Sequence, residues 1–126
     1  MDVLNLINVS AEEMWLIGGT LLLMPLDWIT GYMQAVANKC VQSTKMREGI
    51  IHKLSEVCII VLAVILQCLI AHAGDLGWSV PLVWAATLYL LIMEVNSIVE
   101  NLKAAFPGLA NSKLFSVFEN SNDKDD

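Results

Sequence analysis

The hydrophobic positions of this chain fall into three long runs separated by short polar segments. The runs cover residues 15–37, 55–73 and 80–102, approximately, and each has the length and composition of a helix. At a rise of 1.5 Å per residue the first run is about 34 Å long, whereas the hydrocarbon core of a bilayer is about 30 Å thick. The sequence therefore predicts an all-α integral membrane protein, with three transmembrane helices in a single membrane domain.

Two signals shape the first predicted helix. Ser10 and Glu13 have the Ser-x-x-Glu spacing of a capping box, which indicates a helix start near Ala11. Pro25 lies inside the run and is expected to kink the helix, which neighbouring membrane helices can tolerate. The first helix is therefore expected to begin in water, just before the membrane, and to bend on the way across.

The polar segments give the expected boundaries of the other elements. Gly49 is expected to mark a turn, with the second helix starting near Ile50. After the third run, residues 103–119 are expected to form a cytoplasmic amphipathic segment. Residues 120–126 are polar and acidic, which is typical of a disordered tail.

The basic residues are distributed unevenly between the two sides of the predicted membrane. None precedes the first run and none lies between the second and third runs. The segment between the first and second runs reads as a cytoplasmic basic loop, which contains Lys39, Lys45, Arg47 and Lys53. Since positive loops stay in the cytoplasm, the N-terminus is predicted to lie outside and the C-terminus in the cytoplasm.

Polar residues gather on one side of two of the predicted helices. At 100° per residue, about a third of the circumference of the first helix carries Thr20, Asp27, Thr30, Gly31, Gln34 and Asn38. The same winding aligns, on the third helix, Thr87, Glu94, Ser97 and Asn101. Such stripes are typical of seams between membrane helices. They are equally compatible with a water-lined face in an oligomer, and both interpretations stay open at this point.

Asp27 is the least expected residue in the first run. It is the one formal charge between Met14 and Asn38, and a carboxylate at the centre of a bilayer costs about 2.5–3.5 kcal/mol. We expect no basic residue inside any of the spans. Asp27 is therefore expected to be protonated, hydrogen-bonded to hydroxyl or backbone groups, or exposed to water.

Composition narrows the class of protein. Hydrophobic residues make up 56% of the chain and charged residues 16%, which is well below the charged fraction of a typical soluble domain. The net charge of -6 provides no basic surface for nucleic acid. The sequence has no metal-binding spacing of its Cys and His residues, no phosphate-binding loop and no paired nucleophile and base. We therefore expect no cofactor, no metal and no enzymatic activity.

The chain contains an ordered set of short motifs. They are Asp27-x-x-Thr30-Gly31, then Gly49-Ile50-x-x-Lys53, then Glu94-x-x-Ser97-Ile98-x-Glu100-Asn101, followed by Pro107. In this order the set resembles one family of membrane proteins, the small three-span holins of Gram-positive phages and clostridia. The chain departs from the family pattern at Met93, where relatives often carry Asn, and in its reduced Pro-rich C-terminal segment.

The resemblance implies a protein that accumulates in the bacterial cytoplasmic membrane and assembles with copies of itself. It also implies that the assembly forms lesions through which an endolysin, or in one branch a toxin, leaves the cell. Two alternatives come from other classes. One is a non-lytic scaffold subunit whose polar stripes are permanent seams, and the other is a small ion-conducting protein that uses Asp27 and Glu94.

Overall fold

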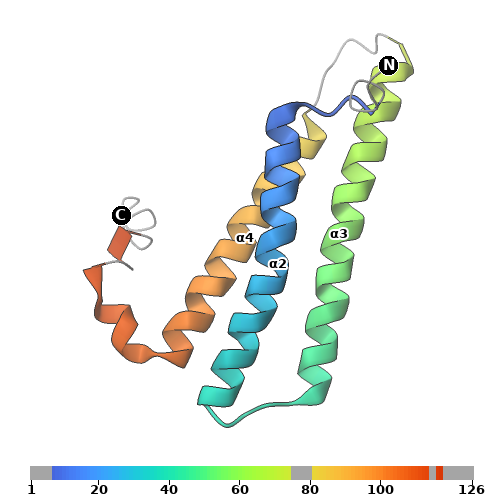
Figure 1. The fold of residues 1–126 in the computed structure, drawn as a ribbon. Coiled ribbons are helices and arrows are strands. Elements are labelled where there is room, and N and C mark those ends of the chain that lie inside the picture. Colours follow the sequence, from blue (N-terminus) through green and yellow to red (C-terminus); the bar gives the residue numbers. More distant parts are fainter. Residues whose placement is uncertain (1–6, 75–80, 114–115, 118–126) are drawn as a thin grey trace, which may run out of the picture.

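A computed structural model describes residues 7–74, 81–113 and 116–117 of the chain, and three long helices account for most of them. Helix α2 spans Ala11–Ala37, α3 spans Ser43–His72 and α4 spans Leu82–Ala105. They lie side by side, with α3 antiparallel to the other two (Figure 1). All three are long and apolar enough to cross a membrane. The prediction of an all-α protein with three membrane-length helices is confirmed.

Helix α2 begins as the sequence predicts. The Ser10 hydroxyl accepts a hydrogen bond from the Glu13 backbone N–H at 3.1 Å, and the Glu13 carboxylate accepts one from the Ser10 N–H at 2.9 Å. This capping box satisfies two backbone donors that the first helical turn leaves free. The helix then runs unbroken through Pro25 and ends at Asn38. Lys39 follows in the left-handed region, with a φ of 53°.

Helix α3 begins earlier than predicted. Its first residue is Ser43 rather than Ile50, and Gly49 is an interior helical position that faces Trp28. Most of residues 43–49 are of types that are compatible with a helix. A membrane helix can also continue beyond the bilayer into water. The expected loop is consequently short, and three of the basic residues assigned to it belong to the helix instead: Lys45, Arg47 and Lys53.

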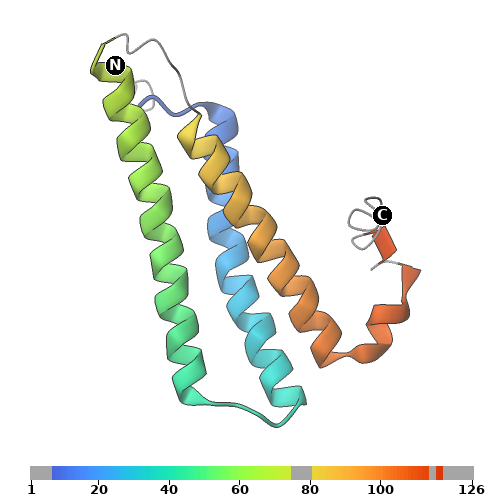
Figure 2. The same cartoon turned by 180° about the vertical axis from the view of Figure 1, so that it is seen from behind.

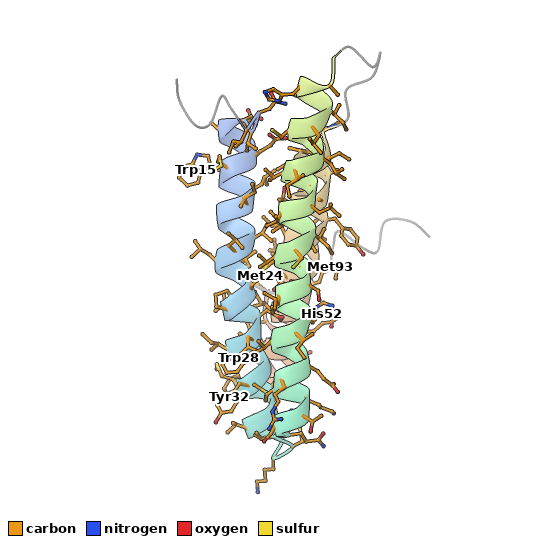
Figure 3. All side chains as sticks on the ribbon, turned by 90° about the vertical axis from the view of Figure 1, so that its right-hand side faces the viewer. Trp15, Met24, Trp28, Tyr32, His52 and Met93 are labelled. Atoms are coloured by element: carbon orange, nitrogen blue, oxygen red, sulfur yellow. The ribbon has the colours of Figure 1, made fainter. Side chains whose placement is uncertain are left out.

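The interior of the bundle is small, and much of the outer surface is apolar. Met24, Ile60 and Leu90 form the buried hydrophobic cluster, one residue from each helix. Met24 points from α2 toward α3, whereas Trp15 and Tyr32 lie on the outer side of α2 (Figure 3). Large apolar side chains that are mostly exposed occur on all three helices, and they include Trp15, Leu22, Ile51, Leu54, Leu69 and Tyr89. In a bilayer this surface faces lipid, so its exposure carries no hydrophobic cost.

The three helices are not equally packed. Helix α2 packs along α4 over most of its length, whereas α3 makes far fewer contacts with either neighbour. The view from behind shows α4 crossing α2 while α3 stands beside them (Figure 2). After α4, the 3-10 helix η1 (Pro107–Asn111) turns the chain away from the bundle (Figure 1). The segment predicted as amphipathic, 103–119, is thus partly the end of α4 and partly η1. Its residues 114–115 and 118–119, and the predicted tail 120–126, lie outside the described part of the chain.

Candidate functional site

The polar stripes predicted on the first and third helices lie against each other in the bundle. In the half nearer the start of α2, Thr20 and Thr87 meet, and both are fully buried, at 0% exposure. The Thr20 hydroxyl donates to the Leu16 carbonyl at 2.8 Å and approaches the Thr87 carbonyl at 3.4 Å. The Thr87 hydroxyl donates back to the Val83 carbonyl of its own helix at 2.5 Å. In this half of the seam, the two threonine hydroxyls each donate a hydrogen bond to a backbone carbonyl of their own helix, so the helices can pack closely without an unpaired donor.

Asn101 connects the two stripes in the other half of the seam. Its side-chain amide donates to Asp27 Oδ1 at 3.1 Å and to the Thr30 hydroxyl at 3.2 Å, and Thr30 donates in turn to the Asp27 carbonyl at 3.0 Å. A Cβ at Gly31 would lie 3.5 Å from the Asn101 amide nitrogen, so the glycine allows α4 to approach closely. Beyond it, the Asn38 amide donates to the Ala104 carbonyl at 3.2 Å. Small and amide residues thus hold α2 and α4 together, as at other membrane helix interfaces.

Lys53 enters this seam from α3 and provides the cation that Asp27 was expected to lack. The Lys53 ammonium lies 2.6 Å from Asp27 Oδ2, forms an ion pair with Glu94, and lies 3.6 Å from Glu56 Oε2. The carboxylates are deeply placed, with Asp27 8% exposed, Glu56 3% and Glu94 1%. We refer to Asp27, Lys53, Glu56 and Glu94 as the charge cluster. It joins all three helices through charge-assisted contacts, which are the strongest kind of hydrogen bond.

The expectation that no cation lies within the spans is therefore wrong, and its cause is the early start of α3. With Ser43 as its first residue, the helix has made about three turns by Lys53 and the side chain is already inside the bundle. A signal for this was present in the sequence. Lys53 begins a row with alternating spacing of three and four residues, which is one face of a helix. The other members of that row are the buried residues of α3, Glu56, Ile60, Ala63 and Gln67.

A second polar contact lies near the opposite end of the bundle, and sequence reasoning did not find it. The Gln67 amide on α3 donates to both carboxylate oxygens of Glu13, at 3.2 and 3.1 Å, and to the Asn8 carbonyl at 2.9 Å. Its carbonyl oxygen accepts from the Val83 backbone N–H at 3.0 Å. Glu13 thereby acts both in the cap of α2 and in the attachment of α3. Polar groups thus attach α3 at Lys53 and at Gln67, and the part of the helix between Glu56 and Gln67 is apolar.

A cavity with a mixed polar and apolar lining leads from the α2–α3 loop toward the charge cluster. Its volume is about 330 Å³, and its lining comes from α2, the loop, α3 and α4. Asp27, Lys53 and Asn101 line this cavity and also belong to the seam described above, so the cavity meets the seam at these residues. Two residues predicted on the stripes, Gln34 and Ser97, also line this cavity, as does Lys45 of the predicted basic loop. Lys39 and Arg47 are exposed near the same end of the bundle. We call this cavity the loop-side vestibule.

Three membrane-length helices around a buried polar seam define a small multi-pass helical membrane protein. The model of the bacteriophage holin family matches residues 7–121, so the chain belongs to that family. No curated protein and no solved structure gives a match. The family is not one of enzymes, and lysis and phage association follow from membership in it. The match covers all three helices, the vestibule and every member of the charge cluster.

Proposed function

We propose that the protein oligomerises in the bacterial cytoplasmic membrane and opens lesions that release an endolysin, or a toxin, from the cytoplasm. The observation that carries this proposal is the polar seam between α2 and α4, with the charge cluster at its centre. In the closed bundle Asp27, Thr30, Lys53 and Asn101 are partnered within one chain, whereas Glu56 and Glu94 have buried oxygens without a hydrogen-bond donor among the described residues. In an open assembly the same groups would line water, which is the other environment that satisfies them.

The uneven packing of the bundle indicates which helix would move. Helix α3 makes few contacts with its neighbours compared with the α2–α4 pair, and polar groups attach it at Lys53 and at Gln67. Moving α3 aside would expose Asp27 and Glu94, which face Lys53, while leaving the extensive packing between α2 and α4 intact. Pairs of α2 and α4 would then form the wall of the lesion, with their apolar outer faces still toward lipid.

We further propose that the N-terminus lies outside and that the α2–α3 loop and the C-terminus lie in the cytoplasm. Exposed Lys39, Lys45 and Arg47 at the loop end support this orientation. A single cysteine can be placed in the loop of a variant lacking Cys40, Cys58 and Cys68. It should react with a membrane-impermeant maleimide only after the cells are permeabilised. Reaction in intact cells would reverse the orientation.

Controlled expression in a bacterium, together with a cytoplasmic muralytic enzyme, tests the function. We expect abrupt loss of the membrane potential, followed by release of the enzyme and lysis. Harmless accumulation of the protein to a high level would refute the proposal and favour a non-lytic scaffold. An ion-selective leak without enzyme release would also refute it, and would favour an ion-conducting protein that uses Asp27 and Glu94.

Asp27→Leu tests the role of the seam within that assay. Removing the carboxylate leaves Lys53 with its Glu94 partner but takes away one of the acceptors of Asn101, which keeps the Thr30 hydroxyl. We expect membrane insertion to be retained and the time of lysis to change severalfold, or lysis to be lost. Glu48→Leu is the matched control, because Glu48 is an exposed acid at the start of α3. Equal lysis times for Asp27→Leu and wild type would remove Asp27 from the mechanism.

A further inference from the structure

The charge cluster has a net negative charge if all its members are ionised. Three carboxylates, from Asp27, Glu56 and Glu94, surround one ammonium, from Lys53. Full ionisation would leave two net negative charges within the membrane-spanning part of the bundle, where an uncompensated charge is strongly unfavourable. Within the described part of the chain, His52 is a further titratable neighbour, and its side chain is 63% exposed. Something else must therefore neutralise part of this charge.

The unpartnered oxygen atoms indicate where the neutralising group lies. Oε2 of Glu94 and both side-chain oxygens of Glu56 are buried without a hydrogen-bond donor among the described residues. His52 Nδ1 lies 2.9 Å from Glu56 Oε1 but does not have hydrogen-bonding geometry. Glu56 Oε2 and Glu94 Oε1 nevertheless both face the Lys53 ammonium, so the two carboxylates are gathered around one cation. Ionised carboxylates only accept hydrogen bonds, so neither can provide a donor for the other's unpartnered oxygens unless one of the two carries a proton.

A metal ion explains the buried, unpartnered oxygens of Glu56 and Glu94 less well than a proton does. Among the described residues, no group of three or more acidic, histidine or cysteine side chains is arranged to bind a metal. Lys53 already occupies the centre of the cluster, and its ammonium would repel a second cation. A proton requires no additional space, and carboxyl groups that share a site commonly share one.

We propose that Glu56 and Glu94 hold a single proton between them, and that the loop-side vestibule connects this proton-binding site with the solution at the α2–α3 loop. Asp27 and Lys53 belong both to the vestibule and to the cluster, so water in the vestibule reaches the network directly. Toward the opposite side the bundle is closed by buried Met24, Ile60 and Leu90 and by the Thr20–Thr87 contact. The site therefore exchanges its proton with one side of the membrane.

Loss of that proton would place two adjacent negative charges between α3 and α4. The charged groups around Glu56 come from every helix packed against it, and together they set the net charge of the site. They are Asp27 from α2, Lys53 and His52 from α3, and Glu94 from α4. Lys53 can compensate one of the three carboxylates, so the others repel. This inference does not depend on the proposed function, because it concerns the closed bundle and holds whether or not lesions form.

Infrared spectroscopy of the full-length protein in phosphatidylcholine vesicles tests the proton. At neutral pH we expect the carbonyl stretch of about one protonated carboxyl per chain, with a shift to lower frequency in deuterated buffer. Glu56→Gln and Glu94→Gln should each abolish it, since the amide of Gln replaces the shared proton as donor. Glu48→Gln, at an exposed site, should retain it. Absence of the band from the wild-type protein would overturn the proposal, even if the variants failed to fold, and so would persistence of the band in both folded variants.

The sidedness is tested in vesicles whose orientation has been measured by tryptic cleavage at Lys39. Alkaline buffer applied to the loop side should remove the carboxyl band before the vesicle interior equilibrates, and the same buffer applied to the opposite side should leave it unchanged. A faster response from the opposite side would overturn the assignment of the vestibule as the path.

Discussion

Replacing Lys53 with Met removes the cation of the charge cluster while keeping a long apolar side chain. Lys53 contacts Asp27 at 2.6 Å, forms an ion pair with Glu94 and lies 3.6 Å from Glu56. Removing one partner of a buried ion pair costs about 3–5 kcal/mol. The Lys53 side chain is 18% exposed and borders the vestibule, so water offsets part of the loss. We therefore expect the free energy of unfolding to fall by about 3 kcal/mol, at the lower end of that range.

Titration of the protein from mild detergent into sodium dodecyl sulfate, followed by tryptophan fluorescence, measures this loss. Arg47→Met is the control, because it removes an exposed positive charge from the same helix, and it should change the free energy by about 0.5 kcal/mol or less. A double-mutant cycle that combines Lys53→Met with Asp27→Asn isolates the interaction between Lys53 and Asp27. The double variant should be more stable than the sum of the single losses predicts, by about 1–3 kcal/mol. Equal unfolding of Lys53→Met and Arg47→Met, or strict additivity in the cycle, would refute the reasoning.

Two other substitutions test the remaining polar features in the same unfolding assay. Gln67→Leu should cost about 2 kcal/mol, because it leaves the Val83 N–H and the Glu13 carboxylate without a partner from α3. A loss no larger than that of Leu69→Ala, at an exposed position on the same helix, would contradict this role. Lys39→Gly should stabilise the protein by about 1 kcal/mol, because Lys39 has a φ of 53° that glycine adopts without strain. A destabilised glycine variant would show that the Lys39 side chain matters more than its backbone.

The periodic features of this chain could be predicted from its sequence. The three apolar runs, the capping box at Ser10 and the two polar stripes follow from spacing within single helices, which the sequence contains directly. The stripes predicted a polar face on the first and third helices, and contacts between Thr20 and Thr87 and between Asp27 and Asn101 join α2 and α4.

The contacts made by α3 could not be predicted in the same way. Whether Lys53 lies in water or in the bundle depends on where α3 starts, and the polar residues 43–49 suit both a loop and a helix. The partners of Lys53 and Gln67 depend on the depth and rotation of α3 relative to its neighbours. One helix's own periodicity contains no information about that depth. The row of residues with a spacing of three and four that begins with Lys53 and Glu56 was the available evidence for a buried Lys53. That evidence can be used only if the second helix is predicted to start before Lys53.

The placement of Lys53 and Gln67 on one face of α3 has a consequence for how this fold tolerates change. They are separated by about 21 Å along the helix axis, and each has partners on both other helices. Rotating α3 about its axis, or sliding it by one turn, would remove both from their partners at once. The alignment of the third helix is therefore encoded by two polar side chains rather than by the shapes of apolar ones. Its lipid-facing residues are free to be exchanged for other apolar residues, so sequences with little similarity in α3 can share one alignment of the three helices.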